Sequence, residues 1–185
     1  MSIAGVVLAG GRSLRMEQNK ALLSFEGQRL LDHMASLLES VHLPVYISGG
    51  DAQYSSFPDG IPFQGPLYGI YNCIQQLHKL AYTAALFVPV DMPLLTTRVL
   101  LTLIEEKNNY DAVYYSQYFL PLFVTFTSSV LDHVTNNFPY LNSGKSLRSF
   151  IQEKHSHQLQ IDGFSRTVFT NVNTPEDWNR LVGCL

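Results

Sequence analysis

Short aliphatic runs alternate with segments of helical periodicity along this chain, and this alternation constrains its fold more than any other feature. The predicted strands are rich in β-branched and aliphatic residues and span residues 3–8, 44–48, 84–90, 111–116, 120–126 and 168–171. The predicted helices repeat apolar residues at helical spacing and span residues 30–41, 67–77, 96–107, 128–137 and 145–153. This order predicts a three-layer, Rossmann-like α/β fold, in which helices flank a mostly parallel central sheet.

A last helix has the clearest start signal in the sequence. Thr174 stands at the N-cap, Pro175 at the first helical position, and Glu176 and Asp177 in the first turn. Thr caps free N–H groups, Pro is pre-organised for a helix start, and acids interact favourably with the helix dipole. The sequence shows no repeat and no linker, so we expect one domain over residues 1–185.

The composition narrows the classes of protein to consider. With 46% hydrophobic residues the chain can bury a core without disulfides, and Cys73 and Cys184 are best interpreted as reduced thiols. A net charge of −3 argues against a general nucleic-acid scaffold, which usually shows a basic excess. No apolar stretch is long enough to span a membrane, and the apolar N-terminus lacks the basic region of a signal peptide. We therefore expect a cytoplasmic protein that binds neither nucleic acid nor membranes.

The segment after the first predicted strand carries the strongest functional signal. The small residues Ala9–Gly11 let the backbone approach a ligand closely, and backbone N–H groups in such a turn can converge on phosphate oxygens. The segment also holds three positive charges within nine positions, on Arg12, Arg15 and Lys20. A triphosphate needs such positive charge where it loses water.

Two well-known phosphate-binding motifs do not fit this segment. A dinucleotide fingerprint needs a third glycine after Gly10 and Gly11, and none follows at the required spacing. Gly144-Lys145-Ser146 matches the end of a P-loop, but Pro139 stands where the first glycine of that motif is required. Spacing alone therefore leaves two interpretations open: a phosphate-binding loop, and an ordinary glycine turn with exposed basic residues.

Asp91 is a second candidate site residue, because it follows the most apolar predicted strand. In open α/β sheets, ligands bind beyond the carboxyl ends of the strands. A carboxylate there suits a hard cation such as Mg²⁺, which shares its ligands with substrate phosphates. Asp91 also stands two residues before Pro93, so a turn-forming or helix-capping role fits its position equally well.

Six short segments along nearly the whole chain share one family resemblance. They are Leu8-Ala9-Gly10-Gly11-Arg12-Ser13-x-Arg15-Met16 followed by Lys20, Gly65-Pro66-Leu67-x-Gly69-Ile70 with Asp59 upstream, Asp91-Met92-Pro93, Pro121-Leu122-Phe123, Ser146-Leu147-Arg148 and Asn171-x-Asn173-Thr174-Pro175-Glu176-Asp177. In content and order these segments resemble the molybdenum cofactor guanylyltransferases, which are nucleotidyltransferases. The chain departs from that family at Glu17, where Gly is usual, and at Asn19, where Asp is usual.

The resemblance implies a nucleotidyltransferase fold and a specific reaction. GMP passes from GTP to molybdopterin, with release of pyrophosphate and formation of molybdopterin guanine dinucleotide. It implies catalytic roles for Lys20, Arg15 and Asp91, with Mg²⁺ on Asp91, and a pterin-side role for Asn171 and Asn173. The residues implied in nucleotide binding are Leu8, Ala9, Gly10, Gly11, Arg12, Lys20, Asp59 and Asp91.

Base specificity depends on one position in this resemblance. Relatives with Leu-Ala-Gly-Gly use guanine nucleotides and those with Leu-Ala-Ala-Gly use cytosine nucleotides, so Gly10 favours GTP. One alternative is a related enzyme that uses CTP or another triphosphate on a different phosphate acceptor. A second is a catalytically silent nucleotide-binding relative, which the departures at Glu17 and Asn19 keep open. The resemblance also suggests molybdoenzymes or other proteins of cofactor biosynthesis as partners.

Overall fold

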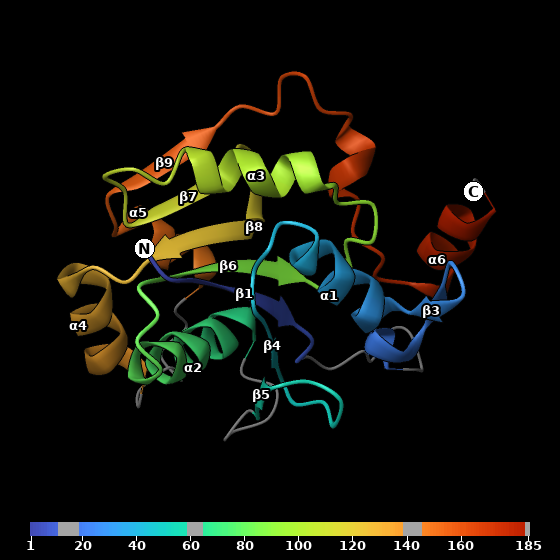
Figure 1. Cartoon of the computed structure of the whole chain (residues 1–185). Coiled ribbons are helices and arrows are strands. Elements are labelled where there is room, and N and C mark those ends of the chain that lie inside the picture. Colours follow the sequence, from blue (N-terminus) through green and yellow to red (C-terminus); the bar gives the residue numbers. More distant parts are fainter. Residues whose placement is uncertain (11–18, 59–64, 139–145, 184–185) are drawn as a thin grey trace.

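A central sheet with strand order β5-β4-β1-β6-β8-β7-β9 organises the molecule (Figure 1). The computed structural model describes residues 1–10, 19–58, 65–138 and 146–183. Within these residues the strands of the sheet are β1 Ile3–Leu8, β4 Val45–Ser48, β5 Ser56–Phe57, β6 Ala84–Pro89, β7 Ala112–Tyr115, β8 Tyr118–Thr125 and β9 Ser156–Leu159. A separate hairpin is formed by β2 Ser24–Phe25 and β3 Gln28–Arg29.

Most strand pairs in the sheet are parallel. The pairs β1–β4, β1–β6, β4–β5 and β7–β9 are parallel, and only β8 runs antiparallel to its neighbours β6 and β7. From β1 the chain leads to β4 and β5 on one side, and it then crosses to β6 on the other side of β1. The direction of strand addition thus reverses between β1 and β6, which makes this point the topological switch of the sheet.

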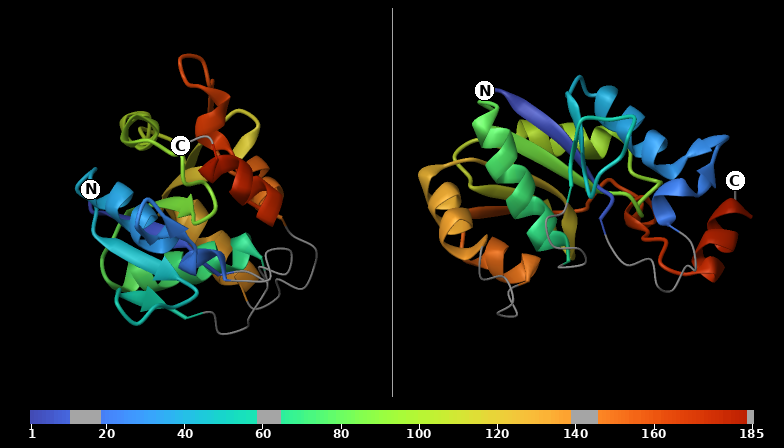
Figure 2. Two further views of the ribbon diagram at one scale, coloured as in Figure 1. Left: turned by 90° about the vertical axis from the view of Figure 1, so that its right-hand side faces the viewer. Right: turned by 90° about the horizontal axis from the view of Figure 1, so that it is seen from below.

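Helices cover both faces of the sheet, which confirms the predicted layered α/β fold (Figures 1 and 2). One apolar cluster joins the sheet to α1 Leu30–Glu39 and α3 Thr97–Glu105. A second cluster joins the opposite face to α2 Pro66–Lys79, α4 Ser128–Asn137 and α5 Leu147–Gln152. The helix α6 Pro175–Val182 lies beside the β2–β3 hairpin, where Trp178 packs edge-on against Phe25.

Side chains of the central strands alternate between the two clusters. In β1, Val6 and Leu8 face α2 whereas Val7 faces α1. In β6, Phe87 faces α2 whereas Leu86 faces α1. A strand that is buried on both faces reads as a continuous apolar run, which is why β1 and β6 lie where the sequence predicts them.

The predicted start of α6 is confirmed. The Thr174 hydroxyl accepts a hydrogen bond from the Asp177 N–H at 3.1 Å, and Asp177 Oδ2 accepts one from the Thr174 N–H at 3.0 Å. This reciprocal pair is a capping box, and Pro175 occupies the first turn.

The prediction of a strand over residues 168–171 is wrong. The chain instead forms a short 3₁₀ helix, η3 Arg166–Phe169, whose start is capped by Ser165. Phe169 is buried and packs against Tyr115 and Tyr118, so a helical turn buries the apolar side chain without adding a strand to the sheet. The edge position is taken by β9, a short and partly exposed strand whose sequence Ser-His-Gln-Leu has no apolar run that could predict it.

None of the helices in the described part of the chain has the length and apolar character needed to cross a membrane.

Gly49 lets the end of β4 approach the start of the glycine-rich segment. Its backbone has a φ of +103°, and a Cβ there would lie 2.8 Å from the Gly10 nitrogen and 2.9 Å from the Gly10 Cα. Gly50 has a similar φ of +87°, but its Cβ would meet nothing within 4 Å. A comparison of substitutions at these two glycines therefore distinguishes the cost of the steric contact from the cost of the backbone conformation.

We expect Gly49→Ala to be less stable than Gly50→Ala by about 1–3 kcal/mol, because only the first substitution forces two backbones apart. The cost of a left-handed backbone, about 1–2 kcal/mol, is shared by both variants. Urea unfolding measures the free energies. Equal destabilisation by the two variants would show that the contact with Gly10 is not close in solution.

Candidate functional site

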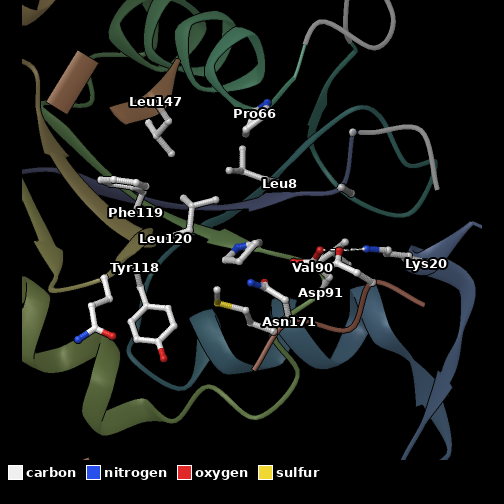
Figure 3. Close-up of a pocket in the computed structure, with 16 residues that line it drawn as sticks. Leu8, Lys20, Pro66, Val90, Asp91, Tyr118, Phe119, Leu120, Leu147 and Asn171 are labelled. Atoms are coloured by element: carbon white, nitrogen blue, oxygen red, sulfur yellow. Dashed lines mark hydrogen bonds and ion pairs between the residues drawn. The ribbon is translucent and has the colours of Figure 1, made fainter. Parts of the chain in front are cut away.

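A cavity of about 530 Å³ opens at the carboxyl ends of β1 and β6 (Figure 3). Its lining comes from the end of β1, the short 3₁₀ helix η1 Lys20–Leu22, the start of α2, the end of β6, the β7–β8 turn with the start of β8, α5 and the segment before α6. The lining residues are Leu8, Ala9, Gly10, Lys20, Pro66, Pro89, Val90, Asp91, Met92, Gln117, Tyr118, Phe119, Leu120, Leu147, Asn171 and Asn173.

The position of the cavity follows from the topology of the sheet. Leu8 pairs with Pro89 at the ends of β1 and β6, and the Val90 N–H donates to the Leu8 carbonyl at 3.2 Å. These strand ends flank the topological switch, where the connections leave in opposite directions and open a crevice. Ala9 and Gly10, the described start of the glycine-rich segment, and Asp91 continue directly from these two strands, so the fold brings these residues to one edge of the sheet.

Lys20 links three distant segments of the chain at this cavity. Its Nζ lies 3.0 Å from Asp91 Oδ2 and donates to Asn173 Oδ1 at 2.7 Å. The Lys20 and Asp91 side chains are 14% and 23% exposed, so water screens this ion pair less than it screens a surface pair. The ammonium group is therefore held beside a carboxylate on the wall of an open cavity.

Asn19 positions Lys20 through the backbone. Lys20 begins η1 Lys20–Leu22, and the Asn19 side-chain oxygen accepts a hydrogen bond from the Ala21 N–H at 3.1 Å as the N-cap of this short helix. An amide oxygen at the N-cap accepts the same hydrogen bond as a carboxylate oxygen. The departure from the family's usual Asp at this position therefore retains the cap next to Lys20.

The segment before α6 is fixed against the end of β6. The Val172 N–H donates to the Asp91 carbonyl at 2.8 Å, and the Val172 side chain is fully buried. Asp177 Oδ2 accepts hydrogen bonds from the N–H groups of Asn173, at 3.1 Å, and Thr174, at 3.0 Å. These bonds, that of Asn173 foremost, hold the pKa of the Asp177 carboxyl below its usual value.

The other half of the cavity is apolar. In Figure 3 the side chains of this half lie away from Lys20 and Asp91. They are Leu8, Pro66, Phe119, Leu120 and Leu147. Next to them, the Tyr118 ring stacks on Phe169 with ring centroids 4.6 Å apart. A cavity with one charged and one apolar half suits a ligand that joins anionic groups to a flat ring system.

In this apolar half, sequence reasoning predicted only Leu8 as a site residue. The residues Gln117–Leu120 of this half come from the turn between β7 and β8 and the start of β8, where the sequence shows a tyrosine-rich stretch. The sequence of this stretch does not show which tyrosines are core residues and which line the cavity. Tyr115 is buried and donates to the Val99 carbonyl at 2.9 Å, whereas Tyr118 lines the cavity.

The structure brings seven of the predicted site residues together in the cavity lining: Leu8, Ala9, Gly10, Lys20, Asp91, Asn171 and Asn173. Four others lie outside the described residues: Gly11, Arg12, Arg15 and Asp59. Within the described ranges no group of three or more His, Cys, Asp or Glu side chains could hold a metal ion.

Comparisons with known proteins agree on one family. The family model described as the MobA-like NTP transferase domain matches residues 5–159. A molybdenum cofactor guanylyltransferase from Xanthomonas euvesicatoria is 36% identical over 179 residues, which cover 96% of this chain and 93% of the relative. A probable molybdenum cofactor guanylyltransferase from Pelotomaculum thermopropionicum is 29% identical over 191 residues, covering 96% and 90%.

Solved structures share the fold. Molybdopterin-guanine dinucleotide biosynthesis protein A from Archaeoglobus fulgidus superposes with a TM-score of 0.75 at 19% identity, with each chain fully covered. A Mycobacterium tuberculosis protein solved in complex with manganese gives a TM-score of 0.72 at 16% identity, also with full coverage of both chains. At these identities the likeness concerns the fold alone.

We expect Asp177→Asn to lose less stability in acid than the natural protein does. Because the folded-state pKa of Asp177 is lowered, the carboxylate stabilises the fold above the usual carboxyl pKa of about 4, and this contribution is lost as the pH falls through the folded-state pKa. Melting temperatures from about pH 6 to about pH 3 should therefore converge at the acid end. A constant difference between the two proteins across this range would contradict the prediction.

Proposed function

The chain belongs to the MobA-like NTP transferase family and is a nucleotidyltransferase, and we propose that it transfers GMP from GTP to molybdopterin. Pyrophosphate is released and molybdopterin guanine dinucleotide is formed. The arrangement of Lys20 between Asp91 and Asn173 supports this proposal most directly, because it puts a cation and a carboxylate together in the lining of one cavity. The 36% identical relative that bears the name of this activity supports it further.

The proposed chemistry needs positioning and charge neutralisation. The terminal phosphate of the acceptor is already an anionic nucleophile, so no general base is required to create one. It attacks the α-phosphorus of GTP, and the bond from that phosphorus to the pyrophosphate oxygen breaks. Lys20 stabilises the charge that develops around the α-phosphate. The backbone at Gly10 and Gly11, with Arg12 and Arg15, is proposed to hold the triphosphate.

Asp91 is the proposed ligand of Mg²⁺. The donor chemistry fits, because a partly exposed carboxylate oxygen on a cavity wall offers the hard ligand that this ion prefers. When bound there, Mg²⁺ would neutralise triphosphate charge. The role of Lys20 is to offer an ammonium donor beside the same carboxylate, 3.0 Å from Asp91 Oδ2.

The two substrates are proposed to contact different residues of the site. Leu8, Ala9, Gly10 and Asp59 belong to the proposed nucleotide side. Asn171 and Asn173 belong to the proposed pterin side, which lies beyond the last residue matched by the family model, residue 159. Since these two residues line the same cavity as Gly10, we propose that residues 1–185 work as one domain.

Guanine specificity, protein partners and location extend the proposal. Gly10 favours GTP through the family resemblance. Contacts with molybdoenzymes or other cofactor-biosynthesis proteins, the absence of nucleic-acid binding and a cytoplasmic location stay predictions from the sequence.

The test of the function is pyrophosphate release. With molybdopterin and Mg²⁺, we expect release from GTP and not from CTP, ATP or UTP, together with formation of the guanine dinucleotide. Release from CTP on another phosphate acceptor would replace the proposal by the related enzyme. Binding of GTP in a thermal-shift assay without turnover would identify a silent nucleotide-binding relative.

The role of Lys20 has its own test. Lys20→Ala should lower kcat by about 10²-fold or more, because it removes a donor to charge that develops in the transition state. Lys79→Ala is the matched control, since Lys79 is an exposed lysine in the last turn of α2. Steady-state rates measure the effect, and circular dichroism checks the fold. Turnover of a folded Lys20→Ala variant at the rate of the control would show that the assignment is wrong.

A further inference from the structure

We infer that Asp177 is a positioning residue, which orients the ammonium group of Lys20 through Asn173. The inference rests on the proposed function, because it assigns Asp177 to the reaction in which Lys20 takes part. Asp177 does not line the cavity, and its carboxylate acts through the backbone of the segment before α6.

Asn173 links Asp177 to Lys20 through two hydrogen bonds, one to its backbone and one to its side chain. Asp177 Oδ2 accepts the Asn173 N–H at 3.1 Å. The Asn173 side-chain oxygen in turn accepts from Lys20 Nζ at 2.7 Å, the shortest hydrogen bond that Lys20 makes among those described above. The orientation of the Asn173 backbone thus bears directly on the position of the ammonium group.

The bond to Asn173 goes beyond what a helix cap requires. A capping box needs only two hydrogen bonds: the Thr174 hydroxyl accepts from the Asp177 N–H, and the Asp177 carboxylate accepts from the Thr174 N–H. Both are present. The same Oδ2 also accepts from the N–H one residue earlier. This additional bond extends the rigid helix start to the residue that contacts Lys20.

Asn173 needs this support because it is exposed. An exposed asparagine in an irregular segment samples several backbone and side-chain conformations, which costs free energy when one of them must be selected. On one side of Asn173, Val172 is buried and bonded to the Asp91 carbonyl. On the other side, Thr174 is bonded to Asp177. The backbone is therefore fixed on both sides of Asn173, by Val172 before it and by the bonds to Asp177 after it.

Neighbouring residues of α6 provide matched controls. Glu176 is the adjacent acid of the first turn and is exposed, so Glu176→Ala removes the same charge from the same turn. Arg180 Nη1 lies 3.8 Å from Asp177 Oδ1 and is largely exposed, so Arg180→Ala removes this ion pair and keeps the carboxylate. Neither control removes the bond between Asp177 and Asn173.

The first experiment needs no substrate. Lys20 is labelled by reductive methylation with limiting formaldehyde, and its modified fraction is measured by peptide mass spectrometry. Asp177→Ala and Asn173→Ala should both label Lys20 about 3-fold faster than the natural protein does, because each releases the ammonium group from one hydrogen bond. Glu176→Ala and Arg180→Ala should label it at the natural rate. An unchanged rate in Asp177→Ala would overturn the inference.

The second experiment is a double-mutant cycle on the reaction. Asp177→Ala should lower kcat about 10-fold with the KM for GTP nearly unchanged, because Lys20 acts in the transition state. In an Asn173→Ala background, Asp177→Ala should cost nothing further, since the residue that transmits its effect is gone. An equal loss in both backgrounds would mean that Asp177 acts only as a helix cap, which overturns the inference.

A milder variant guards against loss of the fold. Asp177→Asn keeps an oxygen that can accept from the Asn173 and Thr174 N–H groups, so it should restore most of the kcat lost in Asp177→Ala. The melting temperature of Asp177→Asn is compared with that of Glu176→Ala to show that the variant is folded and equally stable. If these temperatures match and kcat is not restored, the inference is wrong. If the natural protein forms no dinucleotide, the proposed function fails, whereas the labelling experiment still decides whether Asp177 positions Lys20.

Discussion

The contact between the Lys20 ammonium group and the Asp91 carboxylate is the interaction on which the arrangement of the site depends. It joins the segment after β1 to the end of β6, and the bond from Lys20 to Asn173 adds the segment before α6. These three parts are far apart in sequence, and none of them forms a cavity alone. A partly buried carboxylate without a cation would pay a desolvation cost, so the ion pair makes it possible to keep Asp91 on the cavity wall.

The sheet determines where this ion pair can form. Because strand addition reverses between β1 and β6, the connections that leave these strands diverge and open a crevice at their carboxyl ends. Gly49 adds a second constraint, since only a residue without Cβ allows the end of β4 to lie against Gly10. The cavity thus depends on the reversal of strand addition between β1 and β6 and on the close approach of Gly49, after β4, to the backbone of Gly10.

The parts of the fold that the sequence predicts are those with a strong local signal. β1 and β6 are continuous apolar runs, and α6 has a complete set of capping residues, so each has a local signal. β9 is a short edge strand of mixed polarity, and η3 has the aliphatic and β-branched pattern of a strand, so local patterns fail there. Lys20 and Asp91 are predicted as site residues only through the family resemblance, because the residue pattern alone fits an ordinary glycine turn and a turn-forming aspartate equally well. The apolar half at Gln117–Leu120 is not predicted, because aromatic residues are as common in cores as in cavities.

The ion pair also explains why the negative charge of the proposed triphosphate substrate must be neutralised by other groups. A triphosphate that enters the cavity encounters one ammonium group and one carboxylate on the described wall, and their charges cancel. Neutralisation of the triphosphate must therefore come from charges beyond this pair. The sequence offers Arg12 and Arg15 for part of this need, and the proposed Mg²⁺ would supply the rest. Lys20 also donates to Asn173, so it would keep this hydrogen bond if Asp91 bound the proposed cation.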